Sequence, residues 1–121
     1  MKNFSLPKSL IIGSRDFQEI FEKGKSIHGN CFSLFYLEGE FRGVGFTVKK
    51  EVKNKPDRNR LKRRTRELWR LNFRNYQLPA RIVILTQARA LNMSYRNLEE
   101  EFIQLLCKLE RILSDHAPKP H

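Results

Sequence analysis

The most chemically suggestive part of the sequence is a run of arginines and lysines between positions 49 and 74. It holds twelve basic residues against three acidic ones, and so carries nine of the eleven net positive charges of the chain. Guanidinium and ammonium groups bind phosphate oxygens, and concentrated positive charge repels itself unless a polyanion neutralises it. The run therefore predicts a localised nucleic-acid contact. Composition alone leaves a solvated helix face or a membrane-surface patch as alternatives.

The spacing within this run predicts an amphipathic helix that begins near Asn54, with Pro56 tolerated in its first turn. Four residues share an arc of about 100° and are expected to pack inward: Leu61, Thr65, Leu68 and Trp69. Four basic residues fall on the opposite side: Lys62, Arg63, Arg66 and Arg70. Like charges one turn apart repel each other by roughly 0.2–0.5 kcal/mol per pair, so a polyanion explains this stripe better than folding does.

Aromatic residues upstream offer a second kind of contact. Phe17 and Phe21 lie one turn apart in a helix predicted from 14 to 23, with Ser14 as its cap and Gly24 as its end. Aromatic rings stack on unpaired bases, but the same spacing is typical of residues that pack in a core. The pattern itself favours the core, and it leaves base stacking open.

The remaining segments predict the elements that must position these residues. Residues 31–37 alternate as in a strand, and a hairpin turn at 38–40 is expected to lead into a second strand over 41–49. Residues 82–85 form a continuous apolar run that is typical of a strand buried on both faces. A long amphipathic helix capped by Ser94 follows. This order predicts a two-layer α/β sandwich.

Length and composition narrow the classes of protein. The 121 residues suit one domain, predicted as 1–113, with a flexible tail at 114–121. The sequence has neither a signal-peptide pattern nor an apolar stretch of transmembrane length, so a cytoplasmic protein without membrane contact is expected. Two distant cysteines, expected to be reduced, give no zinc or redox motif, and the scattered acidic residues predict no intrinsic catalytic site; whether the protein itself holds a metal stays open.

The most specific motif is Arg58-Asn59-Arg60-Leu61-Lys62-Arg63, followed by Arg66-Glu67 and preceded by the pair Lys49-Lys50. It resembles the RNR motif of the bacterial ribonuclease P protein family. The resemblance extends over roughly residues 6–113, in the order and at the size of that family.

The resemblance implies an α+β fold, ordered α-β-β-β-α-β-α, that resembles the second domain of ribosomal protein S5. A four-stranded mixed sheet and a left-handed βαβ crossover are part of this expectation. It also implies a subunit of an endoribonuclease that removes the 5′ leader of precursor tRNA and whose chemistry is carried by a catalytic RNA. A 1:1 complex with that RNA is expected, with Mg²⁺ held mainly by the RNA and without an organic cofactor.

By the same resemblance, nine residues are expected to contact the catalytic RNA: Lys49, Lys50, Arg58, Asn59, Arg60, Lys62, Arg63, Arg66 and Arg70. Phe17, Phe21 and Phe35 are expected to bind the leader, since phosphates bind Arg and Lys while unpaired bases stack on aromatic faces. Catalytic residues of the protein itself are not expected.

Two other functions compete with this one. A ribosomal or ribosome-assembly protein is the alternative, because small basic α/β domains are common there. A DNA-binding helix protein is weaker, because the sequence contains neither helix-turn-helix spacing nor a dimer seam.

Overall fold

The computed structural model describes residues 14–39 and 43–116. The elements follow one another in this order: α1 (Ser14–Lys23), β1 (Lys25–His28), β2 (Phe32–Glu38), β3 (Val44–Val48), α2 (Lys55–Asn72), β4 (Ala80–Thr86) and α3 (Tyr95–His116). Short 3₁₀ turns lie at Phe73–Asn75 and Ala88–Asn92. The predicted α-β-β-β-α-β-α order is confirmed. α3 continues to His116, and residues 117–121 lie outside the described part, so the flexible tail at 114–121 stays a prediction.

The four strands form one mixed sheet in the order β1-β2-β4-β3. β4 runs parallel to β3, whereas β2 pairs antiparallel with both β1 and β4. The predicted hairpin between residues 31–37 and 41–49 is therefore wrong, since β4 lies between β2 and β3. The apolar run of β4 explains this, because Ile82, Val83 and Ile84 are fully buried and need cover on both faces. The left hand of the β3-α2-β4 crossover stays a prediction.

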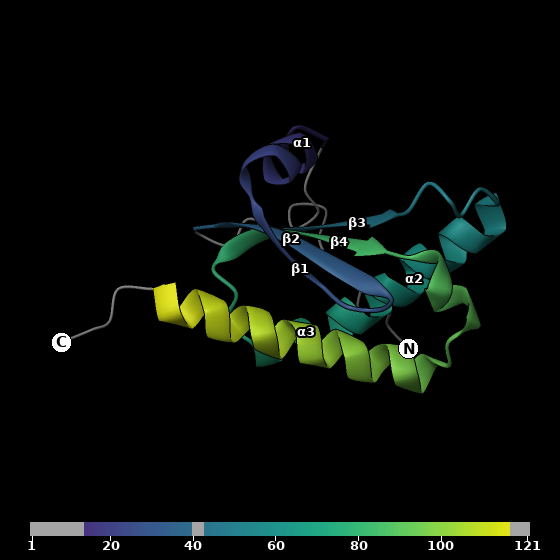
Figure 1. The fold of residues 1–121 in the computed structure, drawn as a ribbon. Helices are drawn as coiled ribbons and strands as arrows, with labels where there is room; N and C mark the ends of the chain where they lie inside the picture. Colours follow the sequence, from purple (N-terminus) through teal and green to yellow (C-terminus); the bar gives the residue numbers. More distant parts are fainter. Residues whose placement is uncertain (1–13, 40–42, 117–121) are drawn as a thin grey trace, which may run out of the picture.

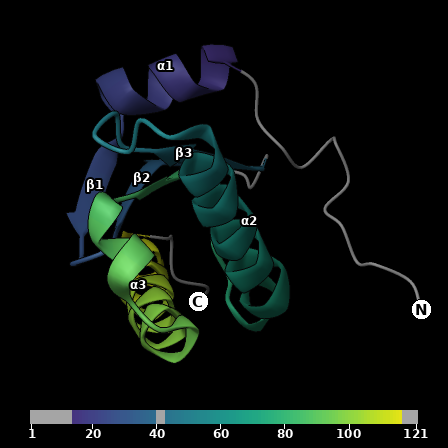
Figure 2. The same ribbon diagram turned by 90° about the vertical axis from the view of Figure 1, so that its right-hand side faces the viewer.

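One face of the sheet is covered by α2 and α3, which lie side by side beneath it (Figures 1 and 2). The main hydrophobic core lies here. α2 buries the four residues that its spacing predicted: Leu61, Thr65, Leu68 and Trp69. α3 buries Leu98, Phe102, Leu105, Leu106, Leu109 and Leu113. Both amphipathic helices thus pack as the sequence indicated.

The other face carries α1, which lies on the opposite side of the sheet from α2 and α3 (Figure 1). A small second cluster joins Ile20 and Val83 with the partly buried Phe17, Phe35 and Leu37. Of these residues, Phe35 and Leu37 lie in the part of β2 that leads to Glu38, and Val83 lies in the middle of β4. The opposite end of the same face, where β3 finishes, is therefore outside this cluster.

Ion pairs and a close backbone approach hold α1 in place. The Arg81 guanidinium on β4 donates to Asp16 at 2.8 Å and lies 2.5 Å from Glu19. These hydrogen bonds raise the pKa of Arg81. At Gly24 a Cβ atom would come within 2.5 Å of the carbonyl oxygens of Ile20 and Tyr36, so a side chain does not fit there. The helix is thus pinned at both ends of its contact with the sheet.

Candidate nucleic-acid interface

A buried threonine pair fixes the rotation of α2. The Thr65 hydroxyl donates to the Leu61 carbonyl at 2.8 Å and lies 2.8 Å from the Thr86 hydroxyl on β4. The Asn54 side chain accepts the Asp57 N–H at 3.5 Å and caps the start of the helix, as the sequence predicted. With this face turned inward, the opposite face of α2 is presented to solvent.

That outward face carries most of the predicted RNA contacts, and we call it the cationic ridge. Asn59, Arg60, Arg63 and Arg66 are exposed, whereas Lys62 and Arg70 are half-buried. The guanidinium of Arg66 lies over the ring of Phe46, 5.8 Å from its centroid. Arg70 donates to Glu67, and that hydrogen bond raises the pKa of Arg70. Apart from Asn59, these ridge residues are therefore arginines and a lysine, with Arg70 tied to an acid on its own helix.

Arg58 differs from its neighbours in the motif. Its Nη1 donates to the carbonyl oxygens of Lys49 at 3.0 Å and Val52 at 2.8 Å, and its Nη2 donates to that of Val48 at 3.2 Å. The helix periodicity contains a signal for this, because Arg58 shares the inward stripe of Leu61 and Thr65 at positions i, i+3 and i+7. Three of its five N–H groups are thus bound to the protein's own backbone.

The lysine pair lies where β3 ends. Lys49 and Lys50 are both exposed, and Lys49 makes an exposed ion pair with Glu51 at 3.7 Å. The Lys49 N–H donates to the Thr86 carbonyl at 3.0 Å, which extends the β3–β4 pairing by one residue. The two lysines consequently lie between the open end of the sheet and the first turn of α2.

The three predicted leader-binding aromatics lie together at the α1 end of the sheet, and we call them the aromatic trough. The Phe17 and Phe21 rings stack with centroids 6.4 Å apart, and Phe21 meets Phe35 edge-on at 4.8 Å. Phe21 is 46% exposed, whereas Phe17 and Phe35 are partly buried. The rings therefore pack against one another, as core residues do, while Phe21 keeps an exposed surface on which a base could stack.

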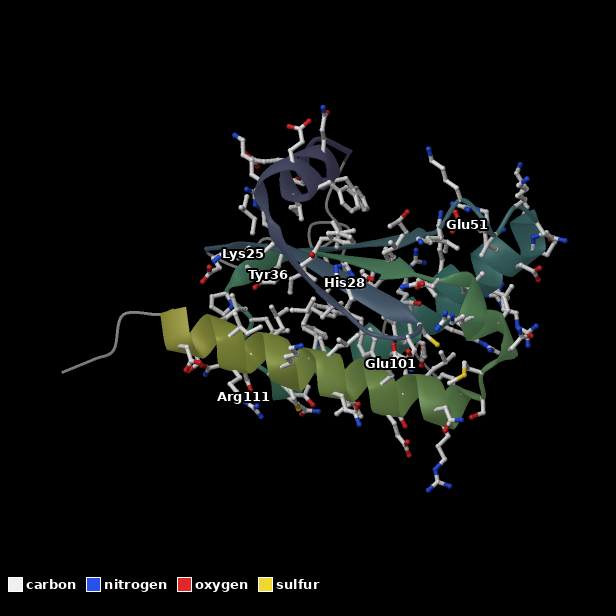
Figure 3. All side chains as sticks on the ribbon, viewed as in Figure 1. Lys25, His28, Tyr36, Glu51, Glu101 and Arg111 are labelled. Atoms are coloured by element: carbon white, nitrogen blue, oxygen red, sulfur yellow. The ribbon has the colours of Figure 1, made fainter. Side chains whose placement is uncertain are left out.

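A polar network continues from the trough across the sheet, and sequence reasoning missed it. His28 on β1 (Figure 3) hydrogen-bonds through Nε2 to the Ser26 hydroxyl at 3.1 Å and through Nδ1 to the Ser33 hydroxyl at 2.9 Å. Gln87 donates to the same Ser33 hydroxyl at 3.5 Å, and the His28 ring meets Phe35 edge-on at 6.0 Å. Only the strand register reveals this network, because it places Ser33 opposite His28.

The predicted site residues thus fall into two groups. The trough lies on the sheet face that carries α1, whereas the ridge lies on α2, which covers the other face (Figure 1); the lysine pair lies between the end of β3 and the start of α2. Across residues 14–39 and 43–116, no group of three His, Cys, Asp or Glu side chains gathers in a way that suits a metal ion. Within the same ranges, none of the helices has the length and apolar character needed to cross a bilayer.

Comparison with known proteins places this arrangement in a family. The family model described as Ribonuclease P matches residues 7–110. The ribonuclease P protein component of Natranaerobius thermophilus is 37% identical over 94 residues, which cover 76% of this chain and 82% of that protein. Its counterpart from Syntrophus aciditrophicus is 33% identical over 111 residues, covering 89% and 93%.

A solved structure agrees with the fold. The ribonuclease P protein from Thermotoga maritima superposes with a TM-score of 0.71 at 24% identity, covering 89% of this chain and 99% of that one. The α+β class and the mixed four-stranded sheet are as the sequence predicted. Given the family match over most of its length, this chain belongs to the bacterial ribonuclease P protein family.

Proposed function

We propose that this chain is the protein subunit of a ribonuclease P holoenzyme. In this role it binds a catalytic RNA and the 5′ leader of precursor tRNA, and so assists endonucleolytic removal of the leader. The observation that carries the proposal is the exposure of basic side chains along the outward face of α2, together with an accessible aromatic trough beside α1 on the other side of the sheet.

The ridge suits the backbone of a folded RNA. Arg60, Arg63 and Arg66 project from a helix whose rotation is fixed by the Thr65–Thr86 contact, so their spacing is set before the RNA arrives. Arginine binds phosphate oxygens with two parallel N–H groups and keeps its charge at any physiological pH. Such contacts position an RNA without reading its sequence.

The trough suits a single strand. Stacking of a base on an aromatic ring contributes about 1–3 kcal/mol and tolerates any base, since every base has a π-face. Phe21 offers the most accessible of the three rings, and Phe35 supports it from the sheet. The polar groups of Ser26, His28 and Gln87 lie farther along the same face, where a strand leaving the trough would meet them.

We assign the hydrolysis itself to the catalytic RNA and to Mg²⁺ held mainly by that RNA, with no organic cofactor. The protein's contribution is to hold RNA and leader in register and to lower their mutual repulsion. A 1:1 protein–RNA complex in the cytoplasm fits this division of labour.

Reconstitution tests the proposal. The chain is mixed with a bacterial ribonuclease P RNA, and cleavage of precursor tRNA is followed at low Mg²⁺ with and without protein. We expect faster cleavage and tighter binding of precursor than of mature tRNA. An Arg60→Gln/Arg66→Gln double variant should lose this effect, whereas the matched Arg96→Gln/Arg111→Gln variant of α3 should keep it. Unchanged cleavage at low Mg²⁺ would overturn the proposal, and copurification with ribosomal RNA in that case would favour a ribosomal role.

A further inference from the structure

Arg58 occupies a position that a surface contact residue would not occupy. It lies in the first turns of α2, half-buried, and its guanidinium faces back toward the loop that joins β3 to the helix. Its three hydrogen bonds reach carbonyl oxygens spread over five residues, those of Val48, Lys49 and Val52. Asn59 and Arg60, the next two residues of the motif, are exposed. The motif is thus divided between one inward and two outward side chains.

The loop that Arg58 contacts needs such a partner. At the end of a strand the backbone carbonyls lose their ladder partners, and carbonyls without any partner lower stability. Here Lys49 is fixed by its N–H to Thr86 and by its carbonyl, which accepts both the Val52 N–H at 3.1 Å and Arg58. The Val52 side chain is buried in the main core. Together these contacts turn the loop so that the side chains of Lys49 and Lys50 face solvent.

We propose that Arg58 is a positioning residue: it binds three backbone carbonyls of residues 48–52 and thereby orients Lys49 and Lys50 toward the phosphates of the catalytic RNA. The inference rests on the proposed RNA-binding function and deepens it. Only a planar guanidinium has the rigid fork of donors that reaches several separate acceptors at once; a lysine ammonium is a single point on a flexible stem.

This role makes a prediction that charge alone does not make. Arg58→Lys keeps the net charge of the protein but breaks the three-carbonyl contact, so Lys49 and Lys50 lose their fixed orientation. We therefore expect the slope of log affinity against log salt to fall by about 0.7–0.9 for each lysine–phosphate contact that is lost. Arg60→Lys, at an exposed neighbouring position, should keep the slope of the wild type.

The experiment measures binding of each full-length variant to the catalytic RNA over a range of salt, below the unfolding temperature. It includes Arg58→Lys, Arg58→Gln, Arg60→Lys and Arg60→Gln, each also combined with Lys49→Gln/Lys50→Gln. Positioning predicts that Arg58→Lys has little further effect once the lysines are gone, since residues that act through one another are not additive.

Other outcomes overturn the inference. If Arg58→Lys keeps the wild-type slope while Arg58→Gln loses one contact, Arg58 itself binds phosphate. If Arg58→Lys lowers only the melting temperature and its effect on affinity adds to that of the lysine changes, Arg58 is a scaffold residue. If the wild-type chain itself shows no salt-dependent binding, the proposed function fails and not this inference alone.

A footprint on the wild-type protein keeps the test valid should Arg58→Lys fail to fold. Phenylglyoxal modifies accessible guanidinium groups, and acetylation modifies lysines, both read by mass spectrometry. Arg58 should be protected in the free protein and unchanged by the RNA, whereas Arg60, Lys49 and Lys50 should become protected only on binding. Reactive Arg58 that the RNA then protects would contradict the inference.

Discussion

The carboxylate of Glu101 on α3 lies 2.7 Å from the backbone nitrogen of Cys31 and accepts its N–H (Figure 3). The same oxygen accepts the Phe32 N–H at 3.0 Å, so one side chain joins α3 to the start of β2. At Gly29 in the preceding turn, a Cβ atom would come within 2.7 Å of this oxygen. The Glu101 carboxylate thus connects the β1–β2 turn to α3 through hydrogen bonds and close packing.

Glu101→Ala should destabilise the fold by about 2–3 kcal/mol, because it leaves two backbone N–H groups without their charged acceptor. The free energy of unfolding in urea is the measurement. Glu100→Ala is the matched control: its ion pair with Arg96 is exposed and 3.8 Å long, so a change under about 0.5 kcal/mol is expected. Equal losses in the two variants would contradict the role of the hydrogen bonds.

Phe21→Ala should weaken leader binding by about 1–3 kcal/mol, the contribution of one stacked base, while the protein stays folded because the ring is 46% exposed. The measurement is the ratio of the Kd values of the holoenzyme for precursor and mature tRNA. Ile20→Ala, a fully buried neighbour on α1, should lower stability instead. A Phe21→Ala protein with an unchanged ratio would show that the trough does not contact the leader.

Arg66→Gln should flatten the salt dependence of catalytic-RNA binding by roughly 0.7–0.9 in the log–log slope, as one phosphate contact is lost. It also removes the contact with the Phe46 ring, so a small loss of thermal stability should accompany it. Arg111→Gln on α3 makes the same charge change at another exposed position and should leave the slope unaltered. A parallel change in both variants would mean that only net charge matters.

The two cysteines should react differently with iodoacetamide. Cys31 is buried, and its burial together with the charge of Glu101 raises the pKa of the thiol to about 11, so it is protonated and shielded at pH 8. Cys107 is exposed. Mass spectrometry should show rapid labelling of Cys107 and labelling of Cys31 only after unfolding; rapid labelling of both in the native state would refute this.

The same shift predicts a loss of stability in alkali. The folded state raises the thiol pKa above its usual 9.0, so it favours the protonated form and the stability contribution is complete below pH 9. It should decline as pH rises from 9 to about 11. Burial also raises the pKa of Tyr36, so ionisation of this tyrosine contributes to the loss of stability of the wild-type protein in the same pH range. The difference between wild type and Cys31→Ala in melting temperature across this range isolates the thiol.

The parts of this structure that sequence could predict are those with a local physical cause. The inward face of α2 follows from helical periodicity, and the start of that helix follows from Asn54 and Pro56. The buried β4 follows from its unbroken apolar run. The ridge was predictable too, because its residues are simply what remains opposite Leu61 and Leu68.

The parts that sequence missed depend on pairing between distant segments. The expected hairpin is wrong because a turn at 38–40 looks the same whether the next strand pairs locally or one strand away. The partners of His28 required the register of β1 on β2, which shows that Ser33 lies opposite. Helical periodicity places Arg58 on the inward face of α2 with Leu61 and Thr65. The resemblance to a motif of RNA contacts nevertheless favoured a solvent-facing position, whereas the guanidinium donates to the Val52 carbonyl.

The position of β3 has a consequence for assembly. Among the described strands β3 pairs only with β4, which follows it in the chain by a whole helix. The loop at 49–54 is tied to this pairing, because the Lys49 N–H donates to the Thr86 carbonyl on β4. The proposed RNA-facing surface thus rests on the completed sheet, and an RNA that binds only the folded surface should stabilise the whole domain and raise its melting temperature with concentration.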